Sequence, residues 1–368
     1  MIKTVHVLTD TNVGGAGMWL LNYLKSYDRE KYSVSVALPE KSMLKDKITS
    51  LGVTVYEIPG IADRSYSKQG VKEFKKLFNN IKPDIVHSHA SLSARIAARQ
   101  LGLRIVNTRH CLEDKKKFPV STIYGIINNY LSDIVIGVSK ATCENLIADG
   151  IKKSKVRLVY NGTYPLKELS PEEKTKVREK YKIPLENTVV GIVARLEPVK
   201  NHELFLKAMQ KVLKNNKNVS VLIVGNGTQE EKLRSMTVQL NISDKVIFTG
   251  YLDNITEVMN IIDINVLTST KEALSLSLIE GMFLKKAAVT TDSSGPCEVV
   301  ENGKTGIVVE NFNDELLAET IGKLVNDKQL CELMGIAGEK RAQELFSAEK
   351  MVNSLDDIYE ELIKSERK

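Results

Sequence analysis

The stretch Glu272-Ala273-Leu274-Ser275-Leu276-Ser277-Leu278-Ile279-Glu280 sets two carboxylates eight positions apart, directly after a short apolar run. The run at 264–268 predicts a buried strand, and the pattern at 276–284 predicts a helix. Glu272 then lies in the loop after a strand, where open α/β sheets bind ligands. Carboxylates in such a place can accept hydrogen bonds from sugar or ribose hydroxyls. Taken alone, the pair fits a ligand site and two ordinary solvated acids about equally well.

Short apolar strands alternate with helical patterns along most of the chain, which indicates βαβ units and parallel sheets. The strands that we expect cover residues 5–8, 33–38, 53–58, 84–87, 104–108, 134–138, 156–160, 189–194, 220–224, 245–248, 264–267, 288–291 and 306–309.

The length of 368 residues suggests two domains. A boundary is expected near 161–173, where Asn161-Gly162 marks a turn and the prolines Pro165 and Pro171 resist helix formation. We therefore predict an α/β protein with two doubly wound parallel-sheet domains that face a central cleft. The first is expected over 1–165 and the second over 166–347.

Two further motifs follow predicted strands. Gly14-Gly15 joins the first strand to a helix, where free N–H groups can hold an anion, although a plain tight turn explains the glycines equally well. Arg195 and Lys200 lie around a turn at the carboxyl end of the strand at 189–194. Two fixed cations there would suit a diphosphate, whereas a lone arginine at a strand end is more often part of a salt bridge.

The order of these motifs resembles that of the retaining glycosyltransferases of family 4, which have the GT-B fold. The resemblance runs from about Val5 to Val309, and no single motif in it is specific. The matching motifs are the paired glutamates Glu272 and Glu280, Gly14-Gly15, His87-Ser88-His89, Asn161-Gly162, Arg195-Leu196, Lys200-Asn201, Gly225-Asn226-Gly227, and Ser294-Gly295 with Glu298.

The resemblance implies a role for each motif of the second, donor-binding domain. Arg195 and Lys200 would hold the leaving diphosphate, Glu280 would accept hydrogen bonds from both ribose hydroxyls, and Glu272 would contact the donor sugar. Backbone groups of the donor pocket would come from Gly225, Ala273, Leu274 and Ser275, with Ser294 and Gly295 beside them.

In the first, acceptor-binding domain, the resemblance puts His89 beside the donor sugar and Gly14 and Gly15 near the donor phosphates or the acceptor. His110 follows another strand and is expected on the acceptor side. The last helix, at 348–368, is expected to cross back to the first domain. Catalytic roles are thus expected for Glu272, His89, Arg195 and Lys200.

Some positions depart from the family pattern: Ala273 and Lys285 stand where glycine is usual, and Ser275 and Ala287 where proline is usual. The changes beside Glu272 bear on which sugar is bound more than on the fold.

Composition narrows the partners. A net charge of +6 favours phosphates or anionic lipid over neutral surfaces, while no nucleic-acid-binding motif is found. The four cysteines include no Cys-x-x-Cys pair, which argues against a disulfide framework or a zinc site. No Asp-x-Asp pair occurs, so we expect a metal-independent enzyme without a cofactor. No signal peptide is recognised at Met1–His6, and a cytoplasmic protein is expected.

Two segments suggest contact with the inner face of the membrane. The pattern at 71–78 predicts a basic amphipathic helix, which more often packs on a core than on lipid. The basic loop Lys115-Lys116-Lys117 is usually just solvated.

The sequence thus predicts a retaining glycosyltransferase of the hexosyltransferase type. It would move a sugar from a nucleotide diphosphate sugar, with UDP-sugar favoured, to a hydroxyl of a cell-surface glycan or lipid-linked precursor. The alternatives are a sugar-nucleotide epimerase or hydrolase of the same fold and a non-catalytic sugar-nucleotide-binding subunit. A nicotinamide-dependent oxidoreductase is disfavoured because Gly14-Gly15-Ala16-Gly17 lacks the spacing GxGxxG.

Overall fold

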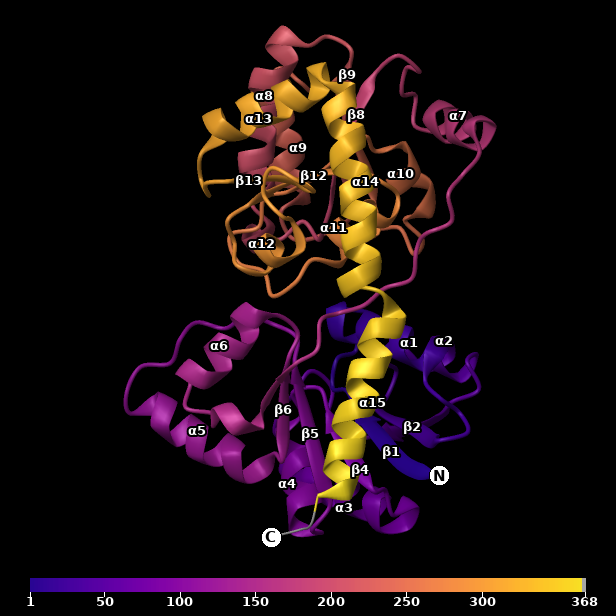
Figure 1. The fold of residues 1–368 in the computed structure, drawn as a ribbon, viewed down its shortest axis with the longest axis vertical. Coiled ribbons are helices and arrows are strands. Elements are labelled where there is room, and N and C mark those ends of the chain that lie inside the picture. Colours follow the sequence, from indigo (N-terminus) through magenta and orange to yellow (C-terminus); the bar gives the residue numbers. More distant parts are fainter. Residues whose placement is uncertain (366–368) are drawn as a thin grey trace. The chain divides into compact units, whose positions relative to one another are not determined.

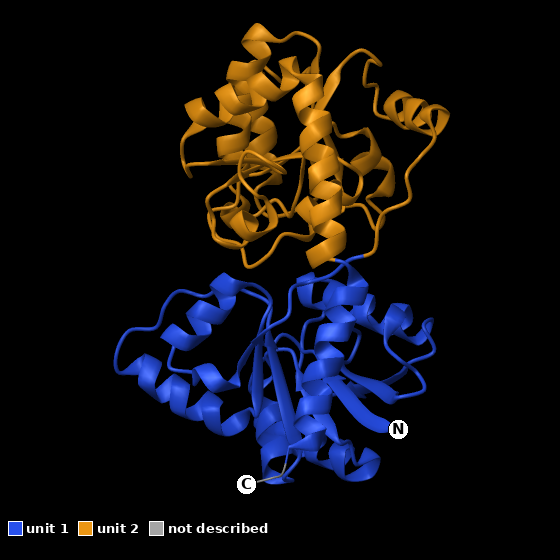
Figure 2. Cartoon of the chain, viewed as in Figure 1, with its two compact units in different colours: residues 1–163, 347–368 blue, residues 164–346 orange. Residues whose placement is uncertain are grey.

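The computed structural model describes residues 1–365 and contains two compact units (Figure 2). Unit 1 comprises Met1–Thr163 together with the C-terminal segment that begins at Ser347, and unit 2 comprises Tyr164–Phe346.

Unit 1 is built on a parallel sheet. Its strands are β1 (Ile2–Val7), β2 (Tyr32–Pro39), β3 (Thr54–Ile58), β4 (Ile85–Ser88), β5 (Arg104–Arg109), β6 (Ile134–Gly137) and β7 (Val156–Leu158). The order across the seven-stranded sheet is β3-β2-β1-β4-β5-β6-β7. The order in which successive strands are added to the sheet therefore reverses between β1 and β4, which is where a doubly wound sheet opens a ligand site.

Helices connect these strands (Figure 1). They are α1 (Gly15–Ser26), α2 (Lys45–Thr49), α3 (Lys68–Ile81), α4 (Leu92–Gln100), α5 (Val120–Leu131), α6 (Lys140–Ala148) and the short 3-10 helix η1 (Lys153–Lys155), with α15 (Ala348–Lys364) added from the C-terminal segment.

Unit 2 repeats this plan with a six-stranded parallel sheet. Its strands are β8 (Thr188–Val193), β9 (Val219–Val224), β10 (Val246–Gly250), β11 (Ile264–Leu267), β12 (Ala287–Thr291) and β13 (Gly306–Val309). The order is β10-β9-β8-β11-β12-β13, so the reversal falls between β8 and β11. Strands β9, β11 and β12 are buried along their whole length, which explains why most of their residues are apolar.

The helices of unit 2 are α7 (Pro171–Lys180), η2 (Pro198–Lys200), α8 (His202–Asn215), α9 (Glu230–Gln239), α10 (Thr256–Ile261), α11 (Leu276–Phe283), α12 (Gly295–Val299), α13 (Asp314–Asn326) and α14 (Lys328–Leu345). Pro171 begins α7 rather than opposing it, because the first helical position has no intrahelical use for the missing N–H. The predicted α/β class with two parallel sheets is confirmed, and each expected strand is present with ends shifted by a few residues.

Helix α15 belongs to the core of unit 1. Ser347 caps its N-terminus by accepting a hydrogen bond from Lys350 N. The side chains of Met351, Leu355 and Tyr359 are buried among those of β1, β2 and α1. At the other end, the Arg104 guanidinium donates to the last helical carbonyls. The expected helix at 348–368 therefore returns to the first unit, and its positions 366–368 lie outside the described residues.

Helix α3 agrees with the more frequent of the two interpretations of the segment at 71–78, that of a helix packed on the core. Its apolar face, with Phe74 and Phe78, is buried against Val5, Val86 and Ile105 in the core of unit 1. The basic amphipathic segment at 71–78 is therefore a core-facing helix and has no apolar face left for a membrane.

Candidate active-site clusters

In unit 2, the loops that follow β8 and β11 are tied together at the switch point. Thr268 Oγ1 donates to the carbonyl oxygens of Lys200 and Asn201, each at 3.0 Å. The backbone N–H of Thr270 donates to Val199 O at 2.8 Å. These bonds fix the turn that carries Lys200 against the loop that carries Glu272.

Lys200 and Glu272 form a half-buried ion pair in which the ammonium donates to Glu272 Oε2. Ser269 Oγ also donates to Oε2, at 3.4 Å. The sequence predicted both residues in one site, and the structure brings their charged atoms into direct contact. A ligand at this edge would thus meet a cation and an anion held side by side.

Arg195 stands on a tight turn that two glycines make possible. A Cβ on Gly225 would lie 2.1 Å from Ala194 O, and one on Gly227 would lie 2.5 Å from Leu196 O. The chain after β9 can therefore press against the end of β8 only if both positions lack a side chain. Arg195 itself is exposed, so its guanidinium is accessible to an anion.

Glu280 lies in α11, one face of which is buried. Desolvation raises the pKa of its carboxyl to about 7. A carboxyl in that state can donate as well as accept a hydrogen bond near neutral pH, which suits contact with hydroxyl groups. Ser275, where the family often has proline, caps the same helix by accepting from Leu278 N.

The loop from Glu272 to Ser275 is backed by the turn at Ser294-Gly295. Gly295 N donates to Glu272 O at 3.2 Å, and a Cβ on Gly295 would lie 1.9 Å from Ala273 O. Ser294 adopts a positive φ of 70°, an uncommon conformation that costs energy for a residue with a side chain. Ala273 and Leu274 are buried, so only their backbone groups can face a ligand.

In unit 1, the switch point holds four histidines in one continuous hydrogen-bonded chain. His87 Nδ1 bonds to the Tyr359 hydroxyl at 2.6 Å, and that hydroxyl bonds to His6 Nε2 at 3.3 Å. His6 Nδ1 then bonds to His89 Nε2 at 3.1 Å, and His89 Nδ1 bonds to His110 Nε2 at 2.8 Å. Thr108 Oγ1 closes the far end, at 2.7 Å from His87 Nε2.

Burial keeps all four imidazoles neutral. It lowers the pKa of His6 and His110 to about 3 and the pKa of His87 and His89 well below the usual range. A neutral imidazole has one N–H and one lone pair, so each link fixes the tautomer of the next ring. The chain therefore has two polarities, which differ in whether His110 Nδ1 donates or accepts.

The free end of the chain is His110 Nδ1, a buried atom with no hydrogen-bond partner among residues 1–365. Both ring nitrogens of His89 are occupied by other histidines. The prediction that His89 meets the donor sugar is untested, but in this arrangement a ligand could reach the chain only at His110. Trp19 packs edge-on against the His110 ring, with centroids 5.6 Å apart.

Gly14 and Gly15 precede Trp19 at the exposed N-terminus of α1. A Cβ added to either glycine would meet nothing within 4 Å, so packing does not demand glycine here. The exposed N–H groups at the start of the helix remain suited to an anion.

Three of these imidazoles have ligand atoms close enough together for a metal ion. Atoms of His6, His87 and His89 lie within 4.8 Å of one another. Each ring already uses both nitrogens in the hydrogen-bonded chain, and the His87 and His89 rings are stacked with an interplanar angle of 13°. Stacked rings direct their lone pairs side by side rather than toward one point, so these residues fit a hydrogen-bonded chain better than a metal.

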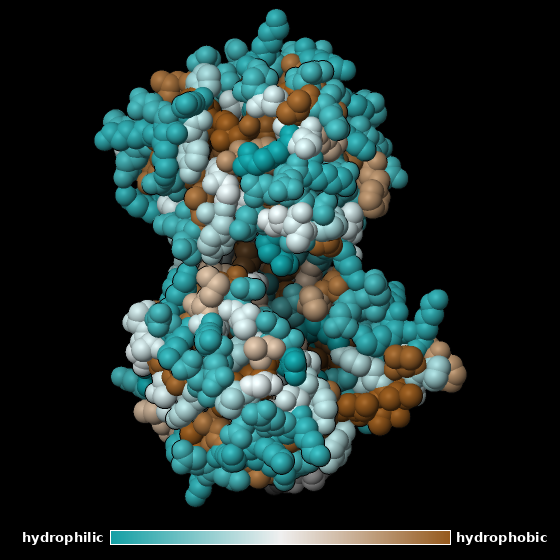
Figure 3. Space-filling view, turned by 180° about the vertical axis from the view of Figure 1, so that it is seen from behind, coloured by the Kyte–Doolittle hydropathy of each residue, from teal (hydrophilic) through white to brown (hydrophobic). Residues whose placement is uncertain are grey.

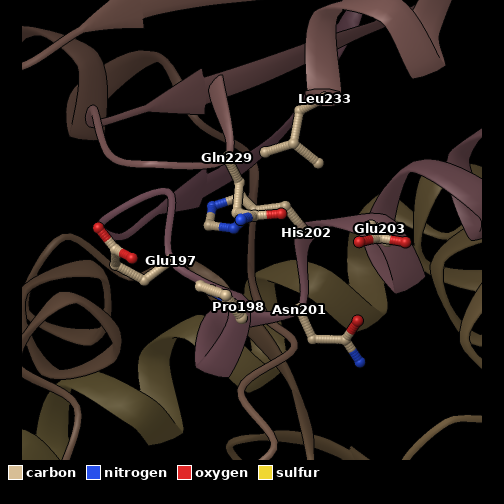
Figure 4. Close-up of a pocket in the computed structure, with 7 residues that line it drawn as sticks. All are labelled: Glu197, Pro198, Asn201, His202, Glu203, Gln229 and Leu233. Carbon is tan, nitrogen blue, oxygen red and sulfur yellow. The ribbon is translucent and has the colours of Figure 1, made fainter. Parts of the chain in front are cut away.

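A small pocket lies beside the Lys200 turn in unit 2 (Figure 4). Its floor is His202, which is buried and whose two ring nitrogens have no partner in the described part of the chain. Burial and the nearby Lys200 charge lower the pKa of His202 to about 4. The pocket is lined by Glu197, Pro198, Asn201, His202, Glu203, Gln229 and Leu233.

Two doubly wound units, each with polar residues gathered at the strand-order reversal, are typical of enzymes with two Rossmann-like domains. Comparison with known families identifies the family to which the chain belongs. Residues 13–165 match the family described as "Glycosyltransferase Family 4", and residues 173–341 match "Glycosyl transferases group 1". The chain belongs to the family 4 glycosyltransferases of the GT-B fold and is a transferase enzyme.

Curated relatives have related descriptions. A putative glycosyltransferase EpsD of Bacillus subtilis is 26% identical over 302 residues, which cover 78% of this chain and 79% of that protein. A UDP-Gal:alpha-D-GlcNAc-diphosphoundecaprenol alpha-1,3-galactosyltransferase of Escherichia coli is 23% identical, and the match covers 98% of this chain and 97% of that protein.

Among solved structures, Anabaena Alr3699/HepE in complex with UDP and glucose superposes with a TM-score of 0.86. The two sequences are 20% identical, and the match covers 98% of this chain and 100% of that chain. That likeness supports the fold of the whole chain.

The sequence reading missed several residues of the unit 1 cluster. His6, Thr108 and Tyr359 complete the histidine chain, and Trp19 packs on all four histidine rings. One signal was available: a histidine in the middle of an apolar strand, as His6 is, must find a partner when buried.

Proposed function

We propose that this enzyme transfers a sugar from a nucleotide diphosphate sugar, with UDP-sugar the favoured donor, to an acceptor hydroxyl with retention of anomeric configuration. The observation that carries the proposal is the arrangement at the switch point of unit 2. There Arg195, Lys200 and Glu272 are held on two loops tied by the Thr268 hydrogen bonds. The acceptor is proposed to be a cell-surface glycan or a lipid-linked precursor.

Unit 2 would bind the donor. Arg195 and Lys200 would stabilise the charge that develops on the leaving diphosphate, a term that often dominates such catalysis. Glu280 would take the ribose hydroxyls, and Glu272 would orient the donor sugar. A diphosphate would compete with Glu272 for Lys200, so donor binding would loosen the ion pair and release the carboxylate toward the sugar.

In the proposed reaction, the bond from the anomeric carbon to the phosphate oxygen breaks and a bond to the acceptor oxygen forms on the same face. The departing phosphate oxygen takes the acceptor proton. Arg195 and Lys200 supply the positive charge that metal ions provide in other transferases, which supports a metal-independent reaction.

Unit 1 would bind the acceptor, with His110 and the helix terminus at Gly14 and Gly15 as its polar groups. The relative of Escherichia coli is named for an acceptor with a diphosphoundecaprenol group, which supports a lipid-linked acceptor here. We propose that the enzyme acts in the cytoplasm, peripherally at the inner face of the membrane. No helix of residues 1–365 is long and apolar enough to cross a membrane.

The first test is thermal unfolding with a panel of UDP-, GDP-, ADP- and dTDP-sugars. A donor at 100 times its dissociation constant should stabilise the protein by about 2.7 kcal/mol. Arg195→Ala should lose the effect, whereas Arg234→Ala, which removes another exposed arginine of unit 2, should keep it. Stabilisation by no sugar nucleotide, or an undiminished effect in Arg195→Ala, would contradict the proposal.

Turnover separates the remaining alternatives. With the stabilising donor, a transferase should form product only when an acceptor is present, and an epimerase or hydrolase should convert the donor alone. Glu272→Gln should abolish turnover in an enzyme but only weaken binding in a non-catalytic subunit. The anomeric configuration of the product, read by NMR, tests retention.

A further inference from the structure

Helix α5 of unit 1 carries its apolar side chains on the side that faces away from the core. Tyr130 is 68% exposed, Ile126 65% and Phe118, just before the helix, 84%. The helix contains no charged residue. Figure 3 shows a patch of hydrophobic surface over α5 at the edge of unit 1. We call this surface the α5 face; it consists of Phe118, Val120, Ile123, Ile126, Ile127 and Tyr130.

The inner side of α5 buries Gly125, Asn128 and Leu131, so most apolar side chains of the helix lie on its outer side, against the usual pattern of a surface helix. Asn128 is buried and accepts a hydrogen bond from Arg95 Nη1 at 2.7 Å. The Tyr124 hydroxyl accepts from Arg109. These bonds hold the polar side chains inward and leave the isoleucines outside.

The helix cannot rotate to bury the α5 face. A Cβ on Gly125 would lie 2.4 Å from Gly150 O, so the backbones touch at this point. Rotation of the helix about its axis would drive the side chains of Ile126 or Ile127 into the Gly150 backbone and break the hydrogen bonds of Asn128.

Cations flank the α5 face at both ends. Lys115 and Lys117 are exposed before the helix begins. Lys152 and Lys153 are exposed at the other end, where Lys152 N donates to Asn129 Oδ1 at 2.9 Å.

The nearby acids are largely neutralised within the protein. Glu113 pairs with Lys116 at 2.6 Å, and the buried Asp149 pairs with Arg109 and Lys116. Asp114 is also exposed beside the lysines. The surroundings of the α5 face are therefore basic on balance.

We infer that the α5 face binds the surface of an anionic lipid bilayer. Phe118, Tyr130 and the isoleucines would enter the boundary between headgroups and acyl chains, and the flanking lysines would contact lipid phosphates. An uncharged apolar stripe with cations around it is the arrangement that interfacial helices use.

A second copy of this chain fits the surface less well. A two-fold interface brings the same patch together with itself. Packed antiparallel, Lys115 and Lys117 would meet Lys152 and Lys153 of the second copy, and packed parallel, each lysine pair would meet its own counterpart. Like charges repel in either case, whereas an anionic bilayer attracts both ends.

The link to catalysis rests on the proposed function: a bilayer at the α5 face would bring unit 1 to the surface where a lipid-linked acceptor resides. The binding itself is argued from the α5 face alone and is tested separately from donor binding.

The experiment is co-sedimentation of the full chain with vesicles of phosphatidylcholine and phosphatidylglycerol, and with phosphatidylcholine alone. Ile126→Asp should weaken binding at least tenfold, because it removes an inserted side chain and adds a negative charge. The matched control is Val238→Asp, at a residue 63% exposed on α9 of unit 2, which should bind like the wild type. Lys115→Gln with Lys117→Gln should weaken binding to the anionic vesicles by about fivefold for each lysine.

Absence of wild-type binding to the anionic vesicles would overturn the inference, as would undiminished binding of Ile126→Asp. A dimer in light scattering that Ile126→Asp converts to a monomer would instead assign the α5 face to a second copy of this chain. Thermal stabilisation by UDP is measured on the same variants, so failure of donor binding and failure of membrane binding are told apart.

Discussion

The ammonium of Lys200 donates a hydrogen bond to the carboxylate of Glu272, across the two loops at the switch point of the second sheet. Each group neutralises the charge of the other. A diphosphate that takes over Lys200 must leave Glu272 free for a new donor, and the hydroxyls of a sugar are such donors. In the proposed function, the ion pair would therefore link recognition of the phosphates to recognition of the sugar.

Removal of one partner of this pair should cost stability. Lys200→Ala leaves a half-buried carboxylate without its cation, and we expect a loss of about 1–3 kcal/mol in the free energy of unfolding. Lys200→Ala with Glu272→Ala should recover part of that loss. A double-mutant cycle by urea denaturation measures the coupling, and additive losses would show that the pair contributes nothing.

Glu280 should make stability fall as the pH rises. Its pKa is raised by burial to about 7 in the folded protein from the ordinary value of 4.5, so the folded state binds the extra proton between these values. This contribution is fully present below about pH 4.5 and is lost as the pH rises through about 7. Glu280→Gln removes the cost of ionisation and should raise the melting temperature at pH 8 more than at pH 6, measured by calorimetry. An equal change at both pH values would contradict the assigned pKa.

The histidine chain should have the opposite effect in acid. These imidazoles stay neutral when folded but gain a proton near pH 6.5 when unfolded, so stability is lost as the pH falls below about 6.5. Each can contribute up to about 1.4 kcal/mol per pH unit. Trp19, the one tryptophan of the chain, packs on all four rings, and its fluorescence therefore reports on unit 1. The urea concentration at the midpoint of unfolding, followed by this fluorescence, should be lower at pH 5 than at pH 7. An equal midpoint at both pH values would show that the folded protein does not keep the rings neutral.

Tyr359→Phe should destabilise unit 1 by about 1–3 kcal/mol, since it leaves ring nitrogens of His87 and His6 unpaired in the core. The matched control is Tyr23→Phe, because the buried Tyr23 hydroxyl has no hydrogen-bond partner within residues 1–365. Urea denaturation followed by Trp19 fluorescence compares the two. Equal effects would mean that the links through the Tyr359 hydroxyl add no stability.

The unit 2 site could be predicted because its parts follow strand ends that are readable from apolar runs. Arg195 and Glu272 come directly after β8 and β11, and parallel strands bring their carboxyl ends to one edge. The bond between Lys200 and Glu272 was not predictable, since it depends on how Thr268 and Thr270 fasten the two loops.

The histidine chain lies beyond sequence reasoning for a different reason. Tyr359 and His6 are separated by 353 positions, and no periodic pattern records a contact over that distance. The α5 face was missed because helical spacing reveals an apolar stripe but not which side meets the core. For the same reason, the sequence suggested membrane contact for the segment at 71–78, although the apolar stripe of that segment is buried.

Helix α15 has a consequence for how the protein is made. Its apolar side chains complete the core of unit 1, although they follow unit 2 in the sequence, while unit 2 is a continuous segment that ends at Phe346. During synthesis, domains tend to fold as units once their residues have emerged. Unit 2 can thus finish folding while the chain is still attached to the ribosome. The first unit to emerge must wait, with His6 and His87 lacking Tyr359, until α15 has followed unit 2 out of the ribosome.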